Sequence, residues 1–75
     1  MTIKLSDVLV FGIRTFILVI NSLDTTNQIT FDNTSPIIQK INLNIQLNYG
    51  DEFAIKQTQL GASPNASATG TIELL

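Results

Sequence analysis

One stretch of the chain alternates apolar and polar side chains without a break: Ile41-Asn42-Leu43-Asn44-Ile45-Gln46-Leu47-Asn48-Tyr49. Successive side chains of a β-strand point to opposite faces of the sheet, so this alternation places all the apolar side chains of the stretch on one face. A helix would spread the same residues around its circumference. The stretch therefore predicts a half-buried antiparallel strand over residues 41–49.

The residues after this stretch continue the pattern beyond a turn. Gly50 and Asp51 suit a turn, because Gly adopts positive φ without strain and an Asp side chain can bond the turn backbone. Phe53 and Ile55 then resume the two-residue period. We therefore expect residues 52–60 to form a second strand, paired with the alternating stretch as a β-hairpin or a strand-turn-strand corner.

The end of the chain reads as a loop followed by a strand. Residues 61–68 are mostly small and include Gly61 and Pro64, which is typical of a loop. Residues 69–75 alternate again and place Ile72 and Leu74 on one face. This pattern predicts a closing strand that pairs inside the sheet.

The first half of the chain carries shorter signals. Its segments suggest a short strand or arm at residues 2–5, buried strands at 8–11 and 15–23, turns at 24–27 and 33–36, a short strand at 28–32, and a lead into the alternating stretch at 37–40. Residues 5–20 also allow a helix, because Leu5, Leu9 and Phe16 fall on one helical stripe. Strands are favoured there for two reasons. Apolar residues would also occupy the other faces of such a helix, and β-branched residues dominate the end of this segment.

These elements predict a single all-β domain over residues 1–75. We expect a small antiparallel β-sandwich, or a truncated jelly roll, of about six strands. The apolar faces of the expected strands, together with one cation among them, supply the candidates for core or interface residues. The candidates are Phe11, Arg14, Phe16, Leu18, Ile41, Leu43, Ile45, Leu47, Phe53, Ile55, Ile72 and Leu74.

The composition argues against catalysis. The chain contains no His and no Cys, so the commonest general base, the thiolate nucleophile and the commonest metal ligands are missing. Of its six acidic residues only Asp51 and Glu52 are adjacent, and neighbours on a strand point to opposite faces. We therefore predict that the protein is not an enzyme, and we name no catalytic, cofactor-binding or metal-binding residue, no cofactor and no small-molecule substrate.

Charge and hydropathy limit the kinds of partner that the protein is expected to bind. A net charge of −2 with only four basic residues provides no basic surface for nucleic acid. Residues 8–20 form the most apolar run, but a membrane helix needs about 20 apolar residues and this run has Arg14 near its middle. No Ala-x-Ala cleavage pattern follows the run. We expect neither nucleic acid nor a membrane to be a partner.

The size and apolar content point to self-association. A chain of 75 residues with 44% hydrophobic residues buries too little surface alone, and small domains add a disulfide, a metal or a partner. With Cys and His absent, a homo-oligomer is the expected route. Arg14 leaves two alternatives open, an ion pair across a subunit interface, with Asp7 or Glu73 of a neighbour, or an outward side chain on an edge strand.

The segment Leu47-Asn48-Tyr49-Gly50-Asp51-Glu52-Phe53-Ala54-Ile55 resembles the penultimate hairpin of the trimeric jelly-roll family of complement-C1q and tumour-necrosis-factor-like domains. Similar jelly rolls occur in phage decoration proteins and tail-fibre heads. The resemblance covers about residues 41–75, and the chain is shorter than a full eight-stranded jelly roll. It implies a homotrimer.

The resemblance, together with the lack of candidate catalytic, cofactor-binding and metal-binding residues, suggests a structural role. We expect a virion protein, foremost a capsid decoration (cement) protein on the surface of a phage head, with the major capsid protein or another virion protein as its partner. A phage tail, baseplate or fibre component is one alternative. A small β-sandwich that binds carbohydrate or a receptor is another, and it would need exposed aromatic side chains.

Overall fold

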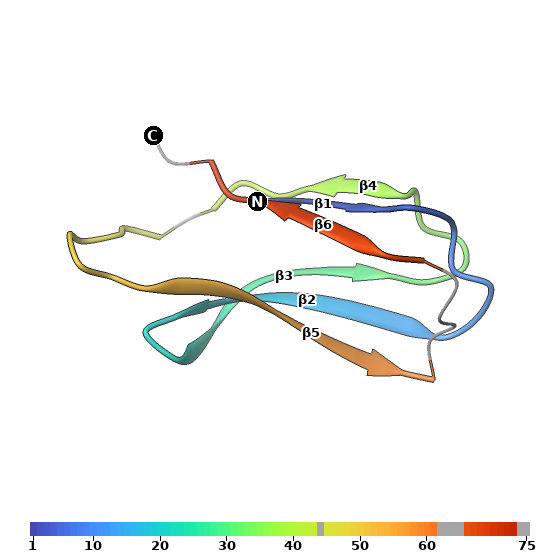
Figure 1. Cartoon of the computed structure of the whole chain (residues 1–75), viewed down its shortest axis with the longest axis horizontal. Coiled ribbons are helices and arrows are strands. Elements are labelled where there is room, and N and C mark those ends of the chain that lie inside the picture. Colours follow the sequence, from blue (N-terminus) through green and yellow to red (C-terminus); the bar gives the residue numbers. More distant parts are fainter. Residues whose placement is uncertain (44, 62–65, 74–75) are drawn as a thin grey trace.

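The protein is a two-layer antiparallel β-sandwich (Figure 1). The computed structural model describes residues 1–43, 45–61 and 66–73. Its strands are β1 (Thr2–Leu5), β2 (Ile13–Ile20), β3 (Leu23–Phe31), β4 (Ile38–Lys40), β5 (Phe53–Leu60) and β6 (Ala68–Thr71). The all-β sandwich of six strands predicted from the sequence is confirmed. The described residues contain no helix, so the helical alternative for residues 5–20 is wrong.

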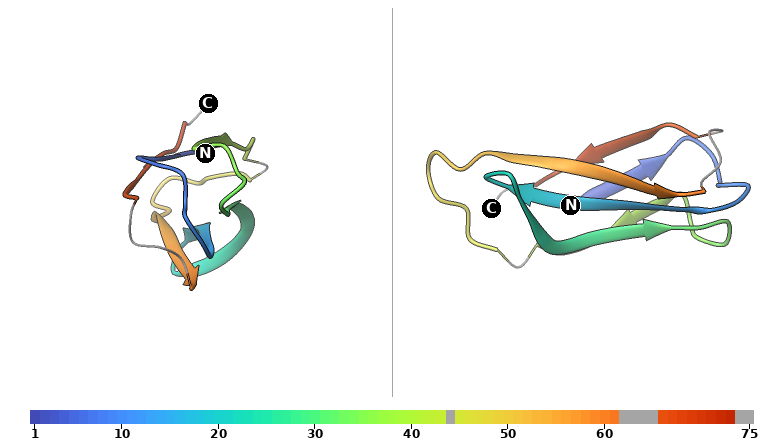
Figure 2. Two further views of the ribbon diagram at one scale, coloured as in Figure 1. Left: turned by 90° about the vertical axis from the view of Figure 1, so that its right-hand side faces the viewer. Right: turned by 90° about the horizontal axis from the view of Figure 1, so that it is seen from below.

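The six strands divide into two sheets of three. One sheet has the order β4-β1-β6 and the other the order β3-β2-β5, with every neighbouring pair antiparallel. Figure 2 shows β1 over β2, with β6 over β5 on one side and β4 over β3 on the other. β1 and β2 are therefore the central strands, and the other four strands form the edges.

A compact apolar core fills the space between the sheets. Its buried residues come from both layers: Met1, Ile3, Leu5, Leu9, Phe16, Leu18, Ile29, Phe31 and Ala66. Phe16 of β2 and Phe31 of β3 meet edge to face, with ring centroids 5.7 Å apart and an interplanar angle of 89°. β2 alternates as a half-buried strand should, because Phe16 and Leu18 point inward and Ile17 lies on the outer face.

The two layers approach closely where β6 crosses above β5. A Cβ atom on Gly70 of β6 would lie 2.7 Å from the Cδ1 of Ile55 and 3.0 Å from the Cδ1 of Ile3. These distances are shorter than ordinary van der Waals contact, so the missing side chain of Gly70 lets β5 and β6 pack together.

The turn that joins β2 to β3 differs from the prediction. β3 begins at Leu23, whereas the sequence suggested a turn at residues 24–27. Asn21 and Ser22 form the two-residue loop, with φ angles of 50° and 66°. Positive φ at both loop residues matches the twist of the flanking strands, and Asn adopts it more easily than most residues. The pair Asn-Ser is a weaker turn signal than Asn-Gly, which is why the sequence pattern missed it.

The described residues of the alternating stretch, 41–43 and 45–49, are not in a strand. Its side chains do alternate, because Ile41 and Leu43 are half-buried while Asn42 and Gln46 are exposed. Met1 stands opposite Ile41 through two hydrogen bonds of 2.9 Å, and the described residues after Ile41 are paired with no strand. The predicted hairpin is also wrong, since the antiparallel neighbour of β5 is β2.

The remaining predictions have mixed outcomes. The strands at residues 2–5 and 52–60 are confirmed as β1 and β5. The closing strand is present as β6 but ends at Thr71, and the prediction that it pairs inside the sheet is wrong, because β6 lies at the edge of its sheet. The turns at 33–36 and at Gly50 are present, the latter with φ of 91°. The strand expected at residues 8–11 is wrong, because this segment is a loop. Leu74 and residues 62–65 lie outside the described residues.

Candidate interaction surface

The structure sorts the predicted core and interface residues into three groups. Arg14, Phe16 and Leu18 are buried on the inner face of β2. Six others are half-buried, and all but Leu47 pack against the core: Ile41, Leu43, Ile45, Leu47, Ile55 and Ile72. Phe11 and Phe53 are not core residues, because they are 55% and 45% exposed. Leu74 is outside the described residues.

Sequence reasoning missed seven buried apolar residues: Met1, Ile3, Leu5, Leu9, Ile29, Phe31 and Ala66. A signal for four of them was present, because Ile3 and Leu5 share one face of a predicted strand, and Ile29 and Phe31 share one face of another. Leu9 lies in a loop, where no side-chain period applies. The buried strand predicted at residues 8–11 did not distinguish Leu9 from its exposed neighbours Val8, Val10 and Phe11.

Arg14 has a structural role that neither sequence alternative described. It lies on the central strand β2, is 4% exposed, and donates from Nη1 to the carbonyl oxygen of Ala66 at 2.6 Å. The outward, edge-strand interpretation is therefore wrong. An ion pair across a subunit interface does not fit either, because the guanidinium is enclosed within one chain. A buried guanidinium needs hydrogen-bond acceptors to offset its desolvation, and the Ala66 carbonyl is one of them.

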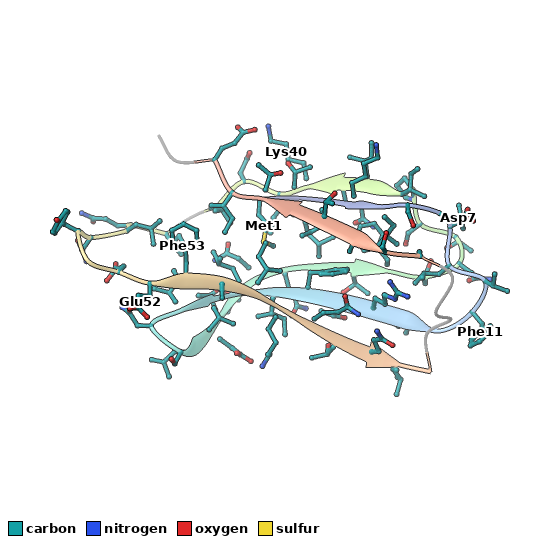
Figure 3. The ribbon with its side chains drawn as sticks, in the orientation of Figure 1. Met1, Asp7, Phe11, Lys40, Glu52 and Phe53 are labelled. Atoms are coloured by element: carbon teal, nitrogen blue, oxygen red, sulfur yellow. The ribbon has the colours of Figure 1, made fainter. Side chains whose placement is uncertain are left out.

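Exposed apolar side chains gather at one end of the sandwich. Val8, Val10, Phe11 and Ile13, here called the loop patch, lie on the loop before β2 and on its first residue, and their exposed fractions run from 39% to 67%. Figure 3 shows Phe11 projecting from this end of the molecule, away from the core. Apolar side chains exposed side by side, rather than singly, mark interaction sites in soluble proteins.

The loop that carries this patch is held in place. Leu9, between two patch residues, is 1% exposed and reaches into the core. Ser6 donates its backbone N–H to the carbonyl oxygen of Ser67 at 2.8 Å, and its Oγ accepts from the N–H of Ser67 at 2.8 Å. The loop patch is therefore presented on an anchored backbone, which lowers the entropy cost of binding a partner.

A groove of about 700 Å³ opens at the other end of the sandwich. Lys40 and Glu73 line the groove, and its apolar lining comes from Met1, Ile41, Leu43, Ile45 and Leu47. The Nζ of Lys40 lies 4.0 Å from Oε2 of Glu73, and both side chains are mostly exposed. The groove offers apolar contacts and one solvated ion pair, and its lining contains no pair of acids placed for general acid-base catalysis.

Metal-binding and acid-base clusters are not found in the part of the chain that the structure describes. No group of three or more Asp and Glu side chains lies close enough to hold a metal ion among residues 1–43, 45–61 and 66–73. The second ion pair, between Lys56 Nζ and Asp24 Oδ2 at 2.6 Å, crosses the outer face of its sheet. Both of these ion pairs thus lie on the surface of the sandwich.

Two aspartates cap turns of the sandwich. Oδ1 of Asp32 accepts from the hydroxyl and the N–H of Thr34, at 2.7 and 2.8 Å, and from the hydroxyl of Ser35 at 3.0 Å. These bonds lower the pKa of Asp32, with the Thr34 hydroxyl as the largest cause. The N–H of Asn48, then the side chain of Asn21, lower the pKa of Asp51 in the same way. Both carboxylates act as turn caps.

Because Asp32 caps a turn, we expect the fold to lose stability at low pH. Because its pKa in the folded protein lies below the ordinary aspartate value of about 3.9, the carboxylate stabilises the fold fully above that value. This contribution is lost as the pH falls through the lowered pKa. We expect Asp32→Asn to reduce the drop in Tm between neutral pH and pH about 3, measured by circular dichroism. Equal drops in the two proteins would contradict the assignment.

Comparisons with other proteins do not assign this chain to a family. Models of protein families, curated proteins and solved structures were compared with the chain, and no match was found. Within the described residues no helix has the length and apolar character needed to cross a membrane.

Proposed function

We propose that this chain is a non-enzymatic structural protein of a virion, which decorates a phage capsid by docking its loop patch on a capsid protein. The observation that carries the proposal is the anchored patch of Val8, Val10, Phe11 and Ile13. A rigid, chemically inert sandwich that offers apolar side chains at one end is suited to cementing a larger particle. Each contact is small, but a shell repeats it many times.

The surface composition supports the same role. The side chains exposed on the strands are largely neutral, as in Thr30, Thr58 and Gln59. A surface of this kind gives no strong electrostatic steering towards nucleic acid or an anionic membrane. The three-fold assembly that the jelly-roll resemblance implies stays a prediction, and the residues of that resemblance do not form the expected hairpin.

Electron microscopy of virions labelled with an antibody against the chain tests the location. Label over the head supports the capsid decoration role. Label over the tail, baseplate or fibres supports the alternative virion component instead. Particles without label, from a lysate that contains the protein, would overturn a virion role altogether.

A pair of matched variants tests the loop patch. Phe11→Asp adds a charge to the patch at a position that is 55% exposed, so the variant should fold and lose binding to the particle. Leu23→Asp makes the same kind of change at a position that is 72% exposed, at the opposite end of β2, and should bind normally. Equal binding by both variants would show that the loop patch is not the docking site.

A second candidate function is carbohydrate or receptor binding. It is favoured by Tyr49, which is fully exposed beside the turn before β5, and by the half-exposed Phe53 four residues later. Aromatic side chains at such positions can stack on sugar rings. A glycan array would support this function if it bound the protein and not a Tyr49→Ala variant. A silent array would count against it.

A further inference from the structure

Among the residues that the structure describes, the outer edge of β5 lacks the features that protect edge strands from pairing with another chain. The edges β4 and β6 are short, with three and four residues. β3 is longer, but the register of β2 and β3 shifts between Ile17 and Val19, and Gln39 of β4 donates from Nε2 to the carbonyl oxygen of Thr30 at 3.0 Å. β5 has eight residues in unbroken register with β2 and contains no Pro or Gly. A long, regular edge is a site for strand addition.

The one charged side chain of β5 does not prevent another strand from pairing with this edge. Lys56 is its only charged residue, and charged side chains commonly keep edge strands apart. Here the Nζ of Lys56 reaches across β2 to Asp24 of β3, at 2.6 Å from Oδ2. This ion pair draws the side chain over the outer face of the sheet, away from the edge.

The backbone groups that face outward can be identified from the ladder between β2 and β5. Asn21 donates its N–H to the carbonyl oxygen of Glu52 at 2.7 Å, and Ile20 stands opposite Phe53. In an antiparallel pair, alternate residues bond the same neighbour. The even-numbered residues of β5 therefore bond β2, and the N–H and C=O groups of Phe53, Ile55, Gln57 and Gln59 point to the open edge.

We propose that this edge pairs with β5 of a second copy of the chain, antiparallel, about a two-fold axis at Gln57. Gln57 then faces Gln57 of the second copy, and Ile55 faces Gln59, so their outward backbone groups bond each other. Lys56 faces Thr58 in this register. An axis at Lys56 instead would set the two Lys56 side chains opposite each other, which is unfavourable. The pairing joins two sheets into one of six strands.

A second copy of the chain is the proposed partner of the β5 edge because this edge is complementary to itself. A two-fold axis at Gln57 pairs residues on the same face of the sheet throughout, so inner face meets inner face and outer face meets outer face. Apart from Lys56, which faces Thr58, only neutral polar and apolar side chains meet along its length. The pairing uses β5 and not the loop patch, so it goes beyond the proposed function and can fail independently of it.

The mass of the full chain in solution at micromolar concentration, by analytical ultracentrifugation, tests the proposal. We expect the mass of two chains. Gln57→Pro removes an N–H that faces the open edge and leaves the ladder with β2 intact, so it should give a folded protein with the mass of one chain. Gln57→Ala keeps the N–H and should remain dimeric. A mass of one or three chains for the native sequence would overturn the proposal.

Two more variants keep the test decisive if Gln57→Pro fails to fold. Gln57→Lys keeps the backbone and places two lysines across the axis, so it should raise the Kd of the dimer about fivefold or more. An unchanged Kd would overturn the register. Thr58→Pro removes an N–H bonded to β2 and should lower the Tm, which checks the assignment of outward and inward groups. A Tm equal to that of the native protein would contradict that assignment.

Discussion

Replacing Phe31 by alanine is expected to lower the free energy of unfolding by about 3–5 kcal/mol. Phe31 has no exposed surface and packs edge to face on Phe16. The change leaves a cavity at the centre of the sandwich, where the strands around it can close only in part. A domain of this size has a total stability of roughly 4–11 kcal/mol, so the variant should be marginally folded.

Phe11→Ala is the matched control for this prediction. It removes the same atoms from a side chain that is 55% exposed, so the free energy of unfolding should change by about 1 kcal/mol or less. Urea denaturation followed by circular dichroism compares the two variants. Similar losses for Phe31→Ala and Phe11→Ala would show that the core is not centred on the Phe16–Phe31 pair.

Residues 41–49 show what an alternating side-chain pattern can and cannot predict. Alternation predicts which side chains lie towards the core, and Ile41, Leu43 and Ile45 are indeed half-buried. It does not predict whether a neighbouring backbone runs beside the segment. Strand formation depends on that neighbour, and beyond the Met1–Ile41 pair no described strand lies hydrogen-bonded to the segment. The segment therefore keeps the alternation without joining a sheet.

The other differences between prediction and structure also concern long-range partners. β5 was predicted as a strand but was assigned to the wrong neighbour, because only the packing of the whole chain brings β2 beside it. Phe11 and Phe16 are alike as side chains, yet one is exposed and the other buried. The loop before β2 turns Phe11 outward and sends Leu9 inward instead. Apolar residues in a loop carry no period that would reveal this choice.

The candidate surface was less predictable than the fold. The sequence indicated a surplus of apolar residues and hence a partner, but the loop patch became visible only once the loop was placed. The open edge of β5 could not be recognised either, because an edge is defined by strand order. Both features arise from tertiary arrangement, whereas the sandwich itself follows from local alternation and turn residues.

Arg14→Ala is expected to lower the free energy of unfolding by about 2–4 kcal/mol. The guanidinium is buried on β2, and its bond to the Ala66 carbonyl connects β2 to the segment that leads into β6. Alanine removes this bond and leaves a cavity. The carbonyl oxygen of Ala66 also loses a charged donor, and a buried polar group without a partner is costly.

Arg14→Met separates the hydrogen bond from the packing. Methionine fills much of the volume and avoids the desolvation of a buried charge, which can offset the lost bond, so it should cost clearly less than alanine. Urea denaturation measures both variants, with sedimentation as a check on assembly. If Arg14→Ala kept its stability and changed only its mass in solution, Arg14 would serve an interface. Since the side chain is enclosed within one chain, we expect folding to be the property that is lost.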